Sequence, residues 1–186
     1  MGFGDGVYGL SEVKQEHPGL FRRIPTTSAN SLYGNSESMD LDREYTDFMD
    51  KHPKGNIYVG FGTFFMPPSA KMEKLIDAIR QLPDYGFIIS IKETAESHLL
   101  VKEANLKNVL LKKFVPQKPL LHDHRIKTFI SHGGGYSISE AVYFGKPLIG
   151  FPQGADQVGS CYRVERMGIA ISVLKNPSTS DFLEAI

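Results

Sequence analysis

Short apolar runs alternate along most of the chain with segments whose apolar residues recur every three or four positions. The apolar runs predict buried strands at 56–62, 86–91, 109–113, 127–131, 147–151 and 169–173. The spaced segments predict helices at 41–51, 69–82, 95–104, 137–143, 157–167 and 181–186. This alternation is typical of the α/β class, in which helices cover both faces of a parallel sheet and the crossovers are right-handed.

Residues 1–40 lack this periodicity and are rich in Gly, Ser, Asn and Thr. We interpret them as a linker or as the remnant of an upstream domain. We expect one folded domain over residues 41–186.

The segment 127–143 combines an apolar strand, three consecutive glycines and a short helix. His132 stands directly before the glycines at 133–135, and Ser137 and Glu140 form the S-x-x-E pattern of a capping box. Glycines let a backbone approach a ligand closely, and the free N–H groups at a helix start attract anions. The segment therefore predicts a phosphate-binding turn with a histidine at its mouth. A tight strand-to-helix turn without a ligand is the alternative.

The residues around this turn resemble the signature of the UDP-dependent glycosyltransferases, a family with the two-domain GT-B fold. Over 114–157 the elements stand in order: an aromatic residue before Val-Pro-Gln, a leucine pair, a histidine, Ser-His-Gly, a serine, a glutamate, Gly-Lys-Pro and Asp-Gln. The resemblance implies that residues 41–186 are the Rossmann-like C-terminal half of such an enzyme. On this basis they form a UDP-sugar-binding domain that is truncated at its C-terminal end.

The same resemblance implies a role for each part of the donor site. Phe114 stands where the family usually has a tryptophan stacked on uracil, Gln117 lies near the ribose and base, and Glu140 accepts the ribose hydroxyls. Thr63, His132 and Ser137 lie at the diphosphate, whereas Asp156 and Gln157 hold the donor sugar. The complete donor-binding set that we expect is Thr63, Phe114, Val115, Gln117, His132, Gly134, Gly135, Tyr136, Ser137, Glu140, Asp156 and Gln157.

Several of these residues also have a structural explanation. Phe114 suits core packing, Ser137 and Glu140 suit the capping box, Asp156 suits a helix N-cap, and Thr63 suits a turn.

Three positions depart from the family's pattern. Tyr136 and Ser160 stand where the family has asparagine, and Gly135 replaces a tryptophan or a serine. Each change weakens contacts to the phosphates or the base, so the identity of the donor sugar stays open.

The implied reaction is the inverting transfer of a hexosyl or glucuronosyl group from a UDP-sugar to a small acceptor. In the family, the acceptor site and the catalytic base, usually a histidine, belong to a separate N-terminal domain. We therefore expect no catalytic base in this chain, and we expect a facing N-terminal domain or partner chain.

Two other functions fit the sequence. One is the catalytic subunit of a two-chain N-acetylglucosaminyltransferase, and the other is a non-catalytic nucleotide-binding module. A dinucleotide-binding dehydrogenase domain is disfavoured, because Ile138 occupies the place of the third glycine in G-x-G-x-x-G.

The charge balance and the cysteine count limit the ligands and partners that this chain can bind. The 186 residues carry 21 basic and 21 acidic side chains, and this balance argues against a nucleic-acid surface. The single cysteine, Cys161, excludes an intramolecular disulfide and a cysteine-based zinc cluster. The chain has no Asp-x-Asp pattern, so we expect no metal and no cofactor besides the UDP-sugar substrate.

The sequence also bears on location. No apolar run approaches the roughly 20 residues of a membrane helix, and residues 1–10 do not resemble a signal peptide. The location therefore stays unknown: both a cytoplasmic protein and one at the endoplasmic reticulum membrane, with an anchor in the full-length protein, fit these features.

Overall fold

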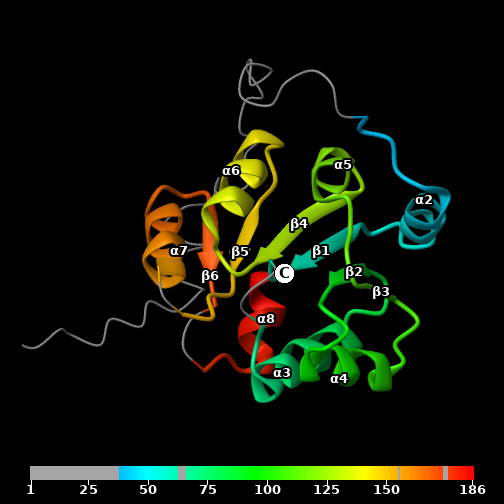
Figure 1. Cartoon of the computed structure of the whole chain (residues 1–186), viewed down its shortest axis with the longest axis horizontal. Coiled ribbons are helices and arrows are strands. Elements are labelled where there is room, and N and C mark those ends of the chain that lie inside the picture. The colour runs from blue at the N-terminus through cyan, green and yellow to red at the C-terminus, as the bar shows by residue number, and fades with distance from the viewer. Residues whose placement is uncertain (1–37, 63–65, 155, 174–175) are drawn as a thin grey trace, which may run out of the picture.

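The computed structural model describes residues 38–62, 66–154, 156–173 and 176–186, and every element named below lies in these ranges (Figure 1). Most of the predicted linker at 1–40 and the candidate Thr63 lie outside the described residues.

Six strands form one sheet in which every neighbouring pair is parallel, in the order β3-β2-β1-β4-β5-β6. The strands are β1 (Asn56–Gly60), β2 (Gly86–Ser90), β3 (Val109–Lys112), β4 (Ile126–Ser131), β5 (Leu148–Gly150) and β6 (Ala170–Ser172). The helices are α2 (Arg43–Asp50), α3 (Ser69–Arg80), α4 (Glu96–Ala104), α5 (Gln117–His122), α6 (Gly135–Tyr143), α7 (Asp156–Arg166) and α8 (Thr179–Ala185). The α/β prediction is confirmed.

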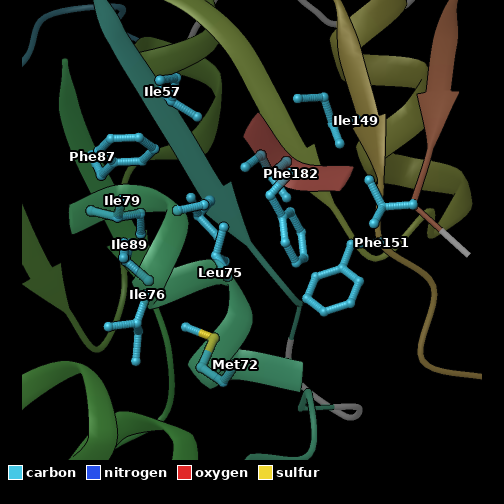
Figure 2. Close-up of a cluster of buried hydrophobic side chains, with 14 of the residues drawn as sticks. Ile57, Met72, Leu75, Ile76, Ile79, Phe87, Ile89, Ile149, Phe151 and Phe182 are labelled. Atoms are coloured by element: carbon cyan, nitrogen blue, oxygen red, sulfur yellow. The ribbon is translucent and has the colours of Figure 1, made fainter. Parts of the chain in front are cut away.

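Helices cover both faces of the sheet, and each face has its own apolar core. Helices α3, α4 and α8 pack on one face, in the lower part of Figure 1, and α2, α5, α6 and α7 pack on the other. Strand side chains alternate between the two faces, so Ile57 and Val59 of β1 join the first core whereas Tyr58 joins the second. In the first core, the rings of Phe151 and Phe182 meet edge to face with centroids 5.0 Å apart (Figure 2).

The predicted strands and helices all form, with bounds that differ by a few residues at most, but α5 was not predicted. One proline stands directly before this helix at 116 and another lies in its first turn at 119, and prolines are typical of turns and loops. The segment forms a helix because Leu120 and Leu121 are fully buried in the second core.

The predicted capping box at Ser137 and Glu140 is wrong. Helix α6 begins two residues earlier, with Gly134 as its N-cap, and no side chain caps it. Ser137 is buried inside the helix, and Glu140 accepts a hydrogen bond from Gln117 instead. Helix α3 likewise begins without a side-chain cap, and its N-cap is Pro68.

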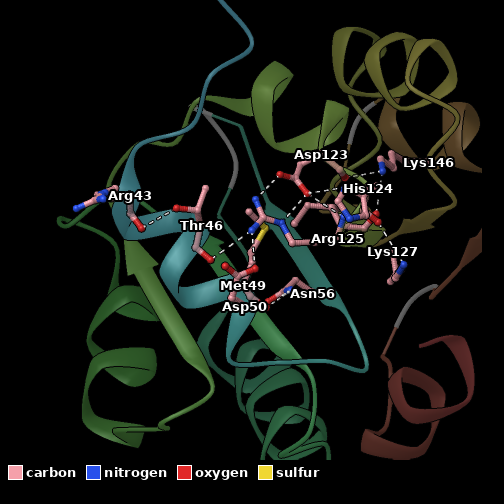
Figure 3. A network of polar contacts seen from close by, with 11 residues as sticks. Arg43, Thr46, Met49, Asp50, Asn56, Asp123, His124, Arg125, Lys127 and Lys146 are labelled. Carbon is pink, nitrogen blue, oxygen red and sulfur yellow. Dashed lines mark hydrogen bonds and ion pairs between the residues drawn. The ribbon is translucent and has the colours of Figure 1, made fainter.

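A polar cluster ties the elements together near the amino ends of the strands (Figure 3). Arg125 Nη2 lies 2.6 Å from Asp123 Oδ2, and Arg125 Nη1 lies 2.7 Å from Asp50 Oδ1 at the end of α2. Burial alone would raise the pKa of Asp123, but the hydrogen bonds from Arg125 lower it overall. The cluster therefore fixes α2 against the turn that enters β4.

Lys146 extends this cluster from the turn before β5. Its Nζ donates to the carbonyl oxygens of Asp123 at 2.8 Å and Ile126 at 2.9 Å, and the residue is 8% exposed. Burial lowers the pKa of Lys146 to about 8, although Asp123 opposes this shift.

Because the pKa of Lys146 is lowered in the folded protein, the free energy of unfolding should rise as the pH increases through the alkaline range. Between about 8 and the ordinary value of 10.5, the unfolded chain binds a proton that the folded chain lacks. The free energy of unfolding therefore rises with pH across this window, by about 3 kcal/mol for a shift of this size. Chemical denaturation at several pH values should show this gain in the parent protein relative to Lys146→Met.

The exposed Lys74 of α3, on the other face of the sheet, provides the matched control, and Lys74→Met should keep the pH dependence of the parent protein. Comparison between variants cancels the other groups that titrate in this range. The same pH dependence in the parent and in Lys146→Met would contradict the prediction.

Candidate functional site

The carboxyl ends of all six strands lie at one edge of the sheet, because every neighbouring pair is parallel. The connections change side between β1 and β4: β1 leads through α3 to β2, whereas β4 leads through α6 to β5 on the other side. In open α/β sheets, such a reversal opens a crevice outside the strand ends, where ligands bind. Gly62 follows β1 and His132 follows β4 at this position.

The His132 imidazole is packed against two glycines. A Cβ at Gly62 would lie 2.9 Å from ring Cε1, and one at Gly134 would lie 2.4 Å from Nε2. Burial lowers the pKa of His132, although the nearby Gly60 carbonyl and the Asp156 carboxylate oppose this shift. The ring is therefore neutral at pH 7 and carries one N–H donor. Within the described residues, its Nδ1 makes no hydrogen bond.

The start of α6 lies directly after this histidine and exposes backbone donors. Gly134 is the N-cap and supplies no side chain, and the first intrahelical bond runs from Ile138 N to Gly134 O at 3.0 Å. The N–H groups of residues 135–137 therefore have no intrahelical acceptor. Together with the helix dipole, they form a place that suits an anion.

The Cys161 thiol of α7 packs directly against the backbone of the glycine turn. A Cβ at Gly133 would lie 2.3 Å from Cys161 Sγ, and one at Gly150 would lie 2.8 Å from it. Gly133 also has φ +83°, which favours glycine, and its N–H donates to Ser131 Oγ at 3.2 Å. The turn can therefore lie directly on α7 only because both positions lack side chains.

Gln117 and Glu140 contact each other although they are 23 residues apart. Gln117 Nε2 donates to Glu140 Oε2 at 2.7 Å, and Gln117 Oε1 accepts from the Tyr58 hydroxyl at 2.9 Å. Tyr58 was not among the predicted site residues, because a tyrosine in an apolar strand suggests only core packing. No pattern in the sequence alone signals its contact with α5.

Two aromatic rings at this edge are open to solvent. Phe114, after β3, is 78% exposed, so it does not pack in the core, and Tyr136 in the first turn of α6 is 84% exposed. Phe114 borders an open hollow of about 610 Å³, whose other lining residues include Glu93, His98 and Lys102. An exposed ring beside a hollow is suited to stacking on a planar ligand.

The remaining predicted residues have different environments. Asp156 is exposed at the start of α7, but Gln157 is 4% exposed and its Oε1 accepts from Gln153 N at 2.9 Å. Val115 is buried in the second core, so only its backbone is available to a ligand. Thr63 lies outside the described residues.

Within the described ranges, no group of three or more His, Cys, Asp and Glu side chains is arranged to hold a metal ion. None of the helices in those ranges combines the length and the apolar character needed to cross a bilayer.

The family described as "UDP-glucoronosyl and UDP-glucosyl transferase" matches residues 33–186 of this chain. A putative UDP-glucuronosyltransferase of Caenorhabditis elegans, ugt-50, is 34% identical over 158 residues, which cover 82% of this chain and 30% of that protein. UDP-glycosyltransferase 74C1 of Arabidopsis thaliana is 37% identical over 143 residues, which cover 74% of this chain and 31% of that protein. The chain thus spans about a third of the length of these relatives.

Solved structures resemble the fold as well. The crystal structure of Os79 from O. sativa in complex with UDP has a TM-score of 0.67 and 25% sequence identity. The alignment covers 75% of this chain and 33% of Os79.

The packing of His132 predicts the effect of adding one methyl group at Gly134. With φ −66° and ψ 145°, this residue tolerates alanine, but the new Cβ would lie 2.4 Å from the ring. Gly134→Ala should therefore push the imidazole toward solvent and raise its pKa toward the ordinary value of 6.5. An NMR titration of the histidine ring would measure this shift.

Gly135→Ala is the matched control, because no atom lies within 4 Å of a Cβ built there. It should leave the pKa of His132 unchanged. An equal pKa of His132 in the parent and in Gly134→Ala would contradict this account of the packing.

Proposed function

This chain belongs to the UDP-glycosyltransferase family, and we propose that the carboxyl edge of its sheet binds the UDP part of a nucleotide-sugar donor. The observation that carries this proposal is the combination of a half-buried neutral histidine with an uncapped helix start at the point where the connections reverse. Anionic ligands gain most from such preorganised donors.

The diphosphate would lie against the N–H groups of residues 135–137. His132 would donate its single N–H to a phosphate oxygen, and Ser137 would add its hydroxyl. As the bond to the sugar breaks, negative charge grows on the departing UDP. Donors already aimed at that position stabilise the charge without reorganisation, so His132 acts on the leaving group in this proposal.

The nucleoside would extend from the diphosphate toward β3. Glu140 would accept hydrogen bonds from the ribose hydroxyls, with Gln117 beside it. The exposed ring of Phe114 would stack on the uracil, with the backbone of Val115 next to it. Gly134, Gly135 and Tyr136 would line the turn, while Thr63 would approach from the end of β1.

The donor sugar would lie near Asp156, which is exposed and close enough to His132 to influence its pKa. Gln157 would contribute through its amide nitrogen, because its oxygen is engaged by Gln153 N. The sugar would be a hexose or a glucuronic acid, transferred with inversion to a small acceptor. A facing N-terminal domain or a partner chain would supply the acceptor site and the catalytic base.

A non-catalytic nucleotide-binding module would share the same UDP site, so binding alone does not separate it from the enzyme. Restored transfer on addition of an acceptor domain would distinguish the two. A two-chain N-acetylglucosaminyltransferase would instead show activity only with a separate partner subunit.

UDP should stabilise this chain against thermal unfolding, because a ligand that binds only the folded state raises the melting temperature with its concentration. NAD should give no shift, since Ile138 occupies the place of the third glycine of the dinucleotide pattern. His132→Ala should weaken UDP binding about tenfold, as expected for the loss of a hydrogen bond to a charged group. Calorimetry that detects NAD binding without UDP binding would overturn the proposal.

The chain alone should not transfer sugar. Inverting transfer needs a general base within hydrogen-bond reach of the acceptor hydroxyl. In this proposal His132 lies beside the leaving diphosphate, on the wrong side of the anomeric carbon for that task. The purified chain should therefore yield no glycoside from a panel of UDP-sugars and phenolic acceptors. Abundant glycoside from the chain alone would show that the base has been misplaced.

A further inference from the structure

Tyr58 is a buried tyrosine whose hydroxyl reaches the candidate site. It lies in the central strand β1, is 2% exposed, and donates to Gln117 Oε1 at 2.9 Å. Gln117 in turn donates to Glu140 Oε2 at 2.7 Å. Three side chains from β1, α5 and α6 therefore form one continuous hydrogen-bonded chain, which we call the Tyr58 relay.

Two neighbours hold the Tyr58 ring in place. It stacks on Phe129 of β4 with centroids 4.6 Å apart and an interplanar angle of 8°. On the same face of β1, Gly60 leaves room for the hydroxyl, since a Cβ there would lie 2.6 Å from Tyr58 Oη. The hydroxyl is therefore fixed by the strand and its partner, and not by flexible surface residues.

The relay has only one consistent hydrogen-bond direction. An ionised carboxylate only accepts, so the amide nitrogen of Gln117 must face Glu140 and its oxygen must face Tyr58. Tyr58 must then donate, and burial raises its pKa so that the hydroxyl stays protonated. Without this donor, Oε1 of Gln117 would lose its buried partner, and the amide would no longer be held in place beside Glu140.

We propose that Tyr58 is a positioning residue for the ribose of the donor, acting through Gln117 on Glu140. The relay engages Oε2 of Glu140 and so leaves Oε1 aimed at the two ribose hydroxyls. This inference rests on the proposed function, because it assigns the ribose to Glu140.

The test compares two ligands, UDP and its 2′,3′-dideoxyribose analogue, which lacks both hydroxyls. Calorimetry should show that the parent protein binds UDP more tightly than the analogue. Tyr58→Phe keeps the stacked ring and removes only the hydroxyl. It should weaken UDP binding about fivefold, the size expected for one hydrogen bond. Affinity for the analogue should change less than about twofold, because the diphosphate contacts remain.

A double-mutant cycle then tests whether Tyr58 acts through Gln117. In a Gln117→Met background, Tyr58→Phe should cause no further loss of UDP affinity. Tyr45→Phe is the matched control, because it removes another buried tyrosine hydroxyl from the same core. This control should leave the preference for UDP over the analogue unchanged.

The outcomes separate the two proposals. If the parent protein does not bind UDP, the proposed function fails and the positioning role fails with it. If the parent binds UDP but Tyr58→Phe weakens UDP and the analogue equally, or weakens neither, the positioning role alone is wrong. A full additional loss in the Gln117→Met background would also overturn it.

Discussion

The close approach of backbone to two side chains, the His132 ring and the Cys161 thiol, is the constraint on which the site depends. Glycines at 62 and 134 leave space for the ring, and glycines at 133 and 150 leave space for the sulfur. A side chain at any of these positions would overlap the ring or the sulfur, so that group would have to move. The turn after β4 is thus held by contacts with Gly62 after β1 and with Cys161 of α7, which also packs on Gly150 of β5. These contacts also fix the position of the first N–H groups of α6, which follow the turn directly.

The polar groups at the two ends of the strands differ in how they are hydrogen-bonded. Near the amino ends, Arg125, Asp123, Asp50 and Lys146 satisfy one another and two backbone carbonyls, so this end is closed and structural. At the carboxyl ends, the N–H groups of residues 135–137 have no intrahelical acceptor, and within the described residues His132 Nδ1 makes no hydrogen bond.

Strands and helices were predictable from the sequence wherever a local pattern of apolar residues determines the structure. Buried parallel strands leave apolar runs that the sequence shows directly. In contrast, α5 has only six residues, one of them Pro119, and the tertiary burial of Leu120 and Leu121 makes it a helix. Ser137 and Glu140 matched a capping pattern, but Gly134 begins the helix and the carboxylate has a distant partner. The resemblance to a family supplied the candidate residues. It did not supply the packing of Gly62 on His132, the burial of Gln157 or the hydrogen bond from Tyr58 to Gln117, which depend on contacts between remote segments.

Cys161 gives this molecule a built-in probe. It is the only thiol in the sequence, it is fully buried, and burial raises its pKa to about 11. In the closed state the sulfur is both inaccessible and almost entirely un-ionised at neutral pH. A small alkylating reagent can therefore react only when α7 separates from the glycine turn. The rate of alkylation would report how often this one contact opens, with no label added to the protein.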